Sequence, residues 1–303
     1  MNVEIVEVSP RDGLQNEHRV LPTETKLELV RRSVAAGLRR VEAASFARPD
    51  RVPQLADAEA VMAAVARDPA VRYSGLVLNR RGLERALSCG VDEVTYVVLA
   101  TETFSQRNQG MSVNESVAAW LDIAAAAEAA GCPASVTISA AFGCPFEGDV
   151  SPAQVGELAA AVLAGRPREL ILADTIGVGV PGQVRDLVGR CRELDPDIVL
   201  RAHFHDTRRT AIANALAAVE AGMVVLDASI GGVGGCPFAP NAGGNVATED
   251  LVYALHRSGY QTGIDFAGVA ETGVWLAGQL GLPQVASALG RAGWAPASGE
   301  LGR

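Results

Sequence analysis

The sequence contains no CxxC pair, no long apolar run and few aromatic residues, which make up 5% of its 303 residues. Its five cysteines are an odd number spread along the chain, so a disulfide framework or a zinc-thiolate site is not expected. No apolar stretch has the length of a membrane span, and no basic segment followed by an apolar one stands near the first residue. We therefore expect a cytoplasmic protein that does not bind a membrane.

Positive charge is also scarce, because 26 Lys and Arg stand against 35 Asp and Glu, for a net charge of −9. The cations form no cluster, so a nucleic acid is not expected as a partner. With 49% hydrophobic residues, the chain is long and apolar enough to bury a large core. The composition is that of an ordinary globular protein.

Short runs rich in β-branched residues alternate with longer segments rich in Ala and Leu. The predicted strands begin at Glu4, Arg39, Val71, Glu93, Ser135, Glu169, Asp197 and Met223. Helices are predicted between them, for example over 23–36, 113–130 and 208–221, with Gly222 ending the last. Eight strands each followed by a helix predict an α/β protein with the (β/α)₈ TIM-barrel fold. We expect one domain over 1–303, with the barrel over about 3–259 and extra helices over about 260–303.

Polar side chains recur where these strands end. They are Arg11, Asp12 and Gln15 after the first strand, Glu42 on the second, Asn79 after the third, Asp174 on the sixth, and His203 and His205 on the seventh. Any one of them could be a capping group or a salt-bridge partner. In TIM barrels, however, the carboxyl ends of the strands form the active site, so this coincidence indicates a catalytic centre.

The stretch "HFHDT" at 203–207 predicts a metal site. Strand side chains alternate between faces, so His203 and His205 point the same way. With a carboxylate such as Asp12 and an amide oxygen such as Asn245, they form a mixed N/O donor set that suits Mg²⁺ or Mn²⁺. The alternative is a pair of hydrogen-bonded histidines in the barrel core.

Two further features bear on the chemistry. Arg11 adjoins a candidate ligand, where its charge can stabilise charge that develops on a carbonyl or enolate oxygen; an ordinary loop arginine is the alternative. The glycine-rich loop 231–245 holds Cys236, which is either a proton donor or acceptor at the reacting carbon, or a small buried residue in a turn. The glycines suit a loop that closes over substrate. Asn245 or Thr248 could cap the helix that follows.

The segment "GVGVPG" at 177–182 satisfies the GxGxxG pattern of dinucleotide-binding loops. It is a lone match, and no nucleotide-binding pattern follows it. We interpret it as a turn between a strand and a helix whose N–H groups could hold at most a phosphate or a carboxylate.

The segments "VEIVEVSPRDGLQNE", "VEAASF", "GCPFEG", "DTIGVG", "HFHDT" and "GGVGGCPFA…GNVATEDLVYAL" resemble the 3-hydroxy-3-methylglutaryl-CoA lyase family. That family belongs to a larger group of divalent-metal TIM barrels, which also contains the isopropylmalate, citramalate and homocitrate synthases. The resemblance covers about residues 3–263, and "GLQNE" and "GGCPFA" are more specific to the lyase.

The resemblance implies a retro-Claisen cleavage of 3-hydroxy-3-methylglutaryl-CoA to acetyl-CoA and acetoacetate. It also implies a homodimer and a divalent metal cofactor, Mg²⁺ or Mn²⁺. It implies metal ligands at Asp12, His203, His205 and Asn245, and catalytic roles for Arg11, Glu42, Cys236 and Asp174. Arg11 would stabilise the enolate, and Cys236 would protonate the carbon. The base is left open between Asp12, His203 and a metal-bound water. For substrate contacts we predict Gln15, Asn79, Thr101 and Arg208.

Several positions depart from the family. Arg208, Arg209 and Thr210 stand where Tyr-Gly-Gln usually follows "HDT", His18 replaces a common lysine, and Thr101 a usual serine. Two added cations could alter acyl specificity, so a lyase for a related 3-hydroxyacyl-CoA is an alternative. A Claisen-type synthase and a non-catalytic metal- or acyl-CoA-binding barrel are others.

Overall fold

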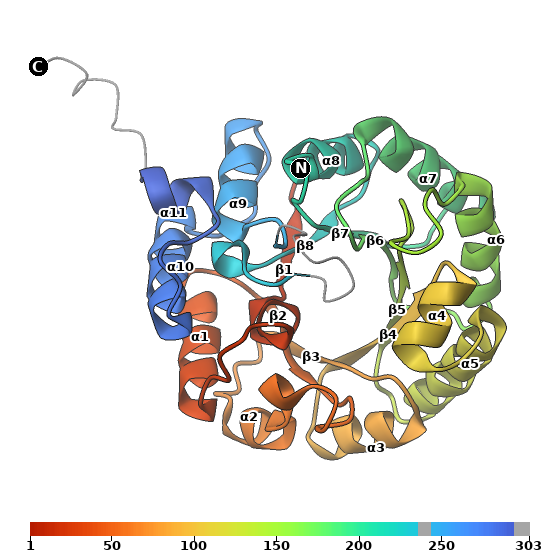
Figure 1. Ribbon diagram of the computed structural model, residues 1–303, viewed down its shortest axis with the longest axis horizontal. Helices are drawn as coiled ribbons and strands as arrows, with labels where there is room; N and C mark the ends of the chain where they lie inside the picture. The colour runs from red at the N-terminus through yellow and green to blue at the C-terminus, as the bar shows by residue number, and fades with distance from the viewer. Residues whose placement is uncertain (236–243, 294–303) are drawn as a thin grey trace, which may run out of the picture.

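The computed structural model describes residues 1–235 and 244–293 and contains a closed barrel of eight parallel strands in sequence order (Figure 1). The strands are β1 Glu4–Glu7, β2 Arg40–Ser45, β3 Arg72–Leu76, β4 Glu93–Leu99, β5 Ala134–Ser139, β6 Leu170–Asp174, β7 Leu200–Phe204 and β8 Val225–Ala228. The barrel closes because β1 pairs with β2 on one side and with β8 on the other. The predicted TIM-barrel fold is confirmed.

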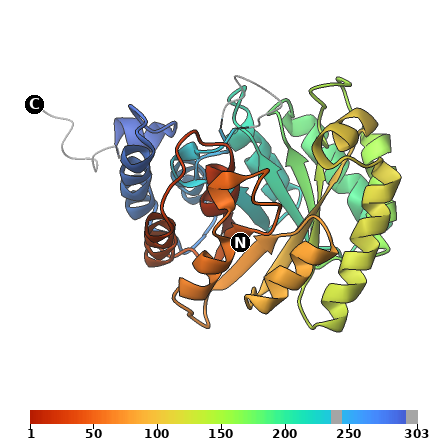
Figure 2. The ribbon, with the colours of Figure 1, turned by 60° about the horizontal axis from the view of Figure 1, so that its bottom comes forward.

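Helices form a ring around the strands (Figure 1). They are α1 Thr23–Ala35, α2 Ala58–Ala64, α3 Arg80–Ser88, α4 Glu102–Gln109, α5 Val113–Ala129, α6 Pro152–Leu163, α7 Pro181–Leu194, α8 Ala211–Glu220, α9 Thr248–Arg257, α10 Phe266–Leu280 and α11 Ala288–Ala292. Figure 2 shows α5, in yellow-green, running along the outside of the strands. Within the described residues, no helix is long and apolar enough to cross a membrane.

The start of α8 differs from the prediction. The sequence predicts a helix from Arg208, whereas α8 begins at Ala211. Arg209 has φ +59°, a left-handed conformation that a right-handed helix excludes. Asp206 accepts the N–H of Ala211, so the helix begins only after this turn.

The inside of the barrel is polar. Arg40 on β2 pairs with Glu93 on β4 and with Glu169 next to β6, and these strands are not neighbours, so the side chains meet across the interior. The outward-facing strand residues pack instead against the helices in the main hydrophobic core, as Val41 and Leu172 do. The strands therefore direct charged side chains into the barrel interior, next to the carboxyl-terminal end where the catalytic centre is expected.

Candidate metal centre and active site

Asp12, His203 and His205 form a cluster at the carboxyl end of the barrel. One ligand atom from each lies within 4.8 Å of the others, and the imidazole centroids are 5.2 Å apart. His203 lies on β7 and His205 directly follows it, so period-two alternation brings both rings to one side, as predicted. The cluster can hold a divalent metal ion.

A π-helical turn, η1 (Ser9–Gly13), directs Asp12 towards β7. The turn closes with the N–H of Gly13 donating to the carbonyl of Val8 over 3.1 Å. Gly234 has φ +98°, and a Cβ on it would lie 2.7 Å from the Gly13 Cα. Only glycine permits this approach, which places the loop after β8 against Asp12.

Asn245 lies beside the same cluster. Its backbone pairs with His205 in an isolated bridge, and its Nδ2 donates to Asp12 Oδ2 over 2.8 Å. Its Oδ1 is buried and has no hydrogen-bond partner in the part of the chain that the structure describes. A buried amide oxygen without a partner is costly, and a metal ion would satisfy it. The expected cap of α9 is wrong: Asn245 faces Asp12, and Thr248 donates to Glu7.

The electrostatics of the cluster favour a cation ligand. Burial tends to raise the pKa of Asp12, but Arg11, His203 and His205 outweigh it and hold that pKa well below its usual range. Asp12 is therefore a carboxylate at neutral pH. Two imidazoles, one carboxylate and one amide oxygen fit a divalent metal, so the residues present satisfy the donor requirement.

Arg11 joins this cluster to Glu42. Its Nε donates to Glu42 Oε2 over 2.6 Å, and its Nη1 donates to Asp12 Oδ1 over 2.7 Å. Burial raises the pKa of Glu42, against the lowering effects of Arg11 and Arg201. Two carboxylates on opposite sides fix the guanidinium plane of Arg11, which directs its charge towards the metal cluster.

Asp174 lies at the end of β6 and is fully buried. Its two oxygens accept the N–H groups of Val178 and Gly179, each over 2.9 Å. These donors belong to the "GVGVPG" segment, so that turn does hold a carboxylate, and the carboxylate belongs to the same chain.

The remaining predicted residues have varied surroundings. Gln15 is half-buried on the turn after Gly13. Asn79 caps α3 by accepting the N–H of Gly82 over 2.8 Å, and the buried Thr101 donates to Cys144 Sγ over 3.0 Å. Arg208 Nη1 donates to two carbonyls of the loop after β6, those of Ile176 and Gly177. Cys236 lies outside the described residues.

Sequence reasoning missed several buried charges near this centre. Asp227 on β8 lies 3.1 Å from His203 Nδ1 and also pairs with Arg201. Glu7 accepts hydrogen bonds from Ser9, Ile230 and Thr248, and burial raises its pKa to about 7. The available signal was a charged residue inside an apolar strand, as in "VVLDAS".

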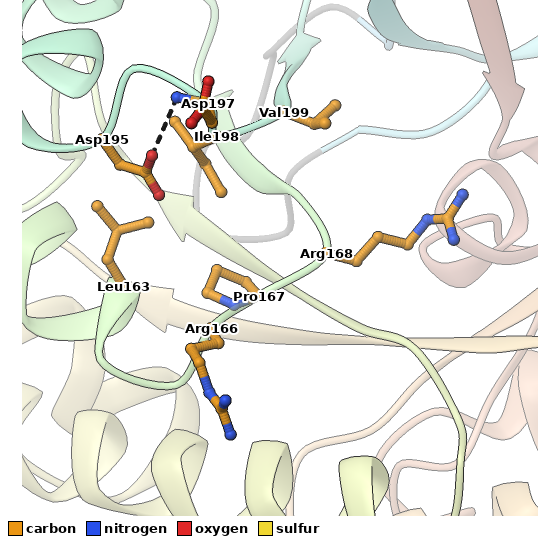
Figure 3. Close-up of a pocket in the computed structure, with 8 residues that line it drawn as sticks. All are labelled: Leu163, Arg166, Pro167, Arg168, Asp195, Asp197, Ile198 and Val199. Atoms are coloured by element: carbon orange, nitrogen blue, oxygen red, sulfur yellow. Dashed lines mark hydrogen bonds between the residues drawn. The ribbon is translucent and has the colours of Figure 1, made fainter.

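A hollow of about 240 Å³ lies at the other end of the barrel (Figure 3). Arg166 and Arg168 line it from the segment before β6, and Asp195, Asp197 and Val199 from the segment before β7. This hollow lies where the strands begin, at the end of the barrel away from the metal cluster, so it is not the active site.

The chain matches the HMGL-like family over residues 2–274. It is 42% identical to the mitochondrial hydroxymethylglutaryl-CoA lyase of Bos taurus over 90% of this chain and 84% of that protein. It is 41% identical to the hydroxymethylglutaryl-CoA lyase of Pseudomonas mevalonii, over 92% of this chain and 93% of that protein. An HMG-CoA lyase from Acinetobacter baumannii, solved in complex with coenzyme A and 3-methylmalate, superposes with a TM-score of 0.92 at 36% identity, covering 98% of each chain. The chain therefore belongs to the HMGL-like family, as its motifs predicted.

Proposed function

We propose that the protein is a metal-dependent carbon–carbon lyase that cleaves 3-hydroxy-3-methylglutaryl-CoA into acetyl-CoA and acetoacetate. One observation carries the proposal: Arg11, braced by Glu42, lies beside Asp12, His203 and His205 at the carboxyl end of the barrel. The lyase names of its relatives support the substrate.

A divalent cation would be held by Asp12, His203, His205 and Asn245, where it would supply the Lewis acidity that makes a tertiary hydroxyl easier to deprotonate. The N/O donor set favours Mg²⁺ or Mn²⁺ over metals that select thiolates. The orphaned Oδ1 of Asn245 supports its place as the fourth ligand.

Arg11 has the central role in bond cleavage. When the bond between the carbinol carbon and the methylene next to the thioester breaks, the deprotonated hydroxyl becomes the ketone of acetoacetate. The electron pair of the broken bond moves into the thioester and gives the enolate of acetyl-CoA. The guanidinium of Arg11, already fixed by Glu42, stabilises the negative charge on the enolate oxygen without reorganising. Glu42 is therefore a positioning residue for Arg11.

The proton steps involve other groups. The lowered pKa of Asp12 makes it a weak base, and both ring nitrogens of His203 are engaged, Nε2 at the proposed metal site and Nδ1 by Asp227. We therefore assign removal of the hydroxyl proton to a water molecule at the site. We assign protonation of the enolate carbon to Cys236, which adjoins the described residue Gly235 in the sequence. Asp174 organises the loop after β6 through Val178 and Gly179.

A related 3-hydroxyacyl-CoA is the second candidate substrate. Arg208 directly follows the "HDT" segment and donates to two carbonyls of the loop after β6, so it adds a positive charge next to the strand that carries His203. A synthase is less well supported because the relatives are named lyases. A non-catalytic barrel is less well supported because binding alone does not require the fixed Arg11–Glu42 pair.

The homodimer and the cytoplasmic location are also proposals. Light scattering of the purified protein tests the dimer. The names of its relatives include both mitochondrial and cytoplasmic forms.

The test is release of acetyl-CoA and acetoacetate from 3-hydroxy-3-methylglutaryl-CoA, measured with Mg²⁺, with Mn²⁺ and with EDTA. We expect both products in equal amounts with either metal, and none with EDTA. A folded, metal-bound protein that releases neither product would refute this substrate, and the assay would then turn to other 3-hydroxyacyl-CoAs.

A further inference from the structure

His203 has two different neighbours on its two ring nitrogens. Its Nε2 faces Asp12 Oδ2 at 3.8 Å, on the side of the proposed metal site. Its Nδ1 lies 3.1 Å from Asp227 Oδ2, on the side of the barrel interior. A neutral imidazole carries one N–H, and its position decides which nitrogen is free to bind a metal.

Arg201 holds Asp227 in place. Its other oxygen, Oδ1, accepts a hydrogen bond from Arg201 Nε. Both residues are buried, at 6% and 2% exposure, so no water competes for these contacts. Arg201 can only donate hydrogen bonds, so the Asp227 oxygen that faces it must be an acceptor.

The contacts continue through the barrel interior. Arg201 Nη1 lies 3.4 Å from Glu169 Oε2, and Glu169 accepts two hydrogen bonds from Arg40, over 2.6 Å and 3.0 Å. Arg40 then pairs with Glu93. Because these groups come from different strands of a closed barrel, Arg201 has little freedom to move away from Asp227.

We propose that Asp227, held by Arg201, is a positioning residue for His203. It fixes His203 as the Nδ1–H tautomer, so the lone pair of Nε2 points into the proposed metal site beside Asp12. The proposal rests on the proposed metal site and not on the identity of the substrate. A carboxylate that accepts the outer N–H of a metal-binding histidine orients the ring and raises its basicity.

Asp227→Asn distinguishes positioning from packing. Arg201 requires an acceptor, so the amide oxygen of the variant faces Arg201 and the amide NH₂ faces His203 Nδ1. Nδ1 must then accept, which moves the proton to Nε2 and blocks the lone pair. The side chain keeps its size, so the variant changes the tautomer with little change in shape.

The first readout is ¹⁵N NMR of the metal-free protein with labelled histidine, at about pH 9, where imidazole is neutral. The chain has 4 histidines, so His203→Gln assigns the signal. We expect Nδ1–H in the wild type and Nε2–H in Asp227→Asn. An Nε2–H tautomer in the wild type overturns the proposal without any variant having to fold.

The second readout is the Mn²⁺ dissociation constant, measured by electron paramagnetic resonance in the absence of substrate. We expect Asp227→Asn to weaken Mn²⁺ binding roughly 10- to 100-fold. The matched control is Glu93→Gln, at the far end of the network, whose amide oxygen can still accept from Arg40. It changes no contact of Arg201, Asp227 or His203, so Mn²⁺ affinity should be unchanged even if stability falls. Equal losses in both variants, or wild-type affinity in Asp227→Asn, would contradict the proposal. Neither readout requires turnover, so both remain informative if the protein prefers another acyl-CoA.

Discussion

Replacing Arg11 with Met tests the chemical step directly. The variant removes the guanidinium that lies 2.7 Å from Asp12 and 2.6 Å from Glu42, while leaving a side chain of similar length. A fixed charge that stabilises a developing oxyanion is worth roughly 3–4 kcal/mol, so we expect kcat to fall on the order of 10²- to 10³-fold. The Mn²⁺ affinity should persist, because the ligands Asp12, His203 and His205 remain.

The same substitution has a predictable effect on stability. Glu42 is 1% exposed, and its Oε1 already has no hydrogen-bond partner within the described residues, so the loss of Arg11 leaves a buried carboxylate without its counter-ion. Breaking such a pair costs about 3 kcal/mol or more while the acid stays ionised. Burial already raises the pKa of Glu42 in the folded protein, and the variant raises it further. The unfolded chain therefore releases this proton first as pH rises, and the variant should lose stability as pH rises above about 4.5, the ordinary pKa of a glutamate.

The assay combines single-turnover kinetics with urea unfolding at two pH values. Arg11→Lys is the matched control, because it keeps the charge but not the forked contact with Glu42, and it should retain intermediate activity. A folded, metal-bound Arg11→Met protein whose kcat is within tenfold of the wild type would refute the role of Arg11.

Three further substitutions have definite expected outcomes. Burial raises the pKa of Glu249 from 4.5 to about 7. Its contribution to the free energy of unfolding is therefore complete below pH 4.5, and about 3 kcal/mol of it is lost as pH rises through 7. Glu249→Gln should remove this pH dependence from the unfolding curves. Gly234→Ala places a Cβ 2.7 Å from Gly13 Cα at a positive φ, so calorimetry should show a loss of about 1–3 kcal/mol, and Mn²⁺ binding should weaken. Arg208→Ala removes the hydrogen bonds to the loop after β6 and should raise KM severalfold with little change in metal affinity; an unchanged KM would remove Arg208 from the substrate site.

The barrel could be predicted because its signal is repeated. Each buried strand is a short β-branched run, and each is followed by a helical segment, so an error at one boundary leaves the alternation intact. Boundaries were less accurate. The helix expected from Arg208 begins at Ala211, because Arg209 takes a left-handed conformation that helix propensity does not reveal.

The outer part of the site could also be predicted, because a barrel brings the ends of its strands together. His203 and His205 follow from strand alternation alone, and Asp12 from its place after the first strand. The supporting groups could not be predicted with the same rules. Whether Asp227 contacts His203 depends on the stagger of β8 against β7, which a sequence pattern does not specify.

One divalent metal is expected to bind between the ends of β1 and β7. Anomalous diffraction from crystals grown with Mn²⁺ tests it most directly. We predict a single strong peak in contact with Asp12, His203, His205 and Asn245. A catalytically active crystal whose manganese lies elsewhere, or that binds none at these four residues, would contradict this metal site.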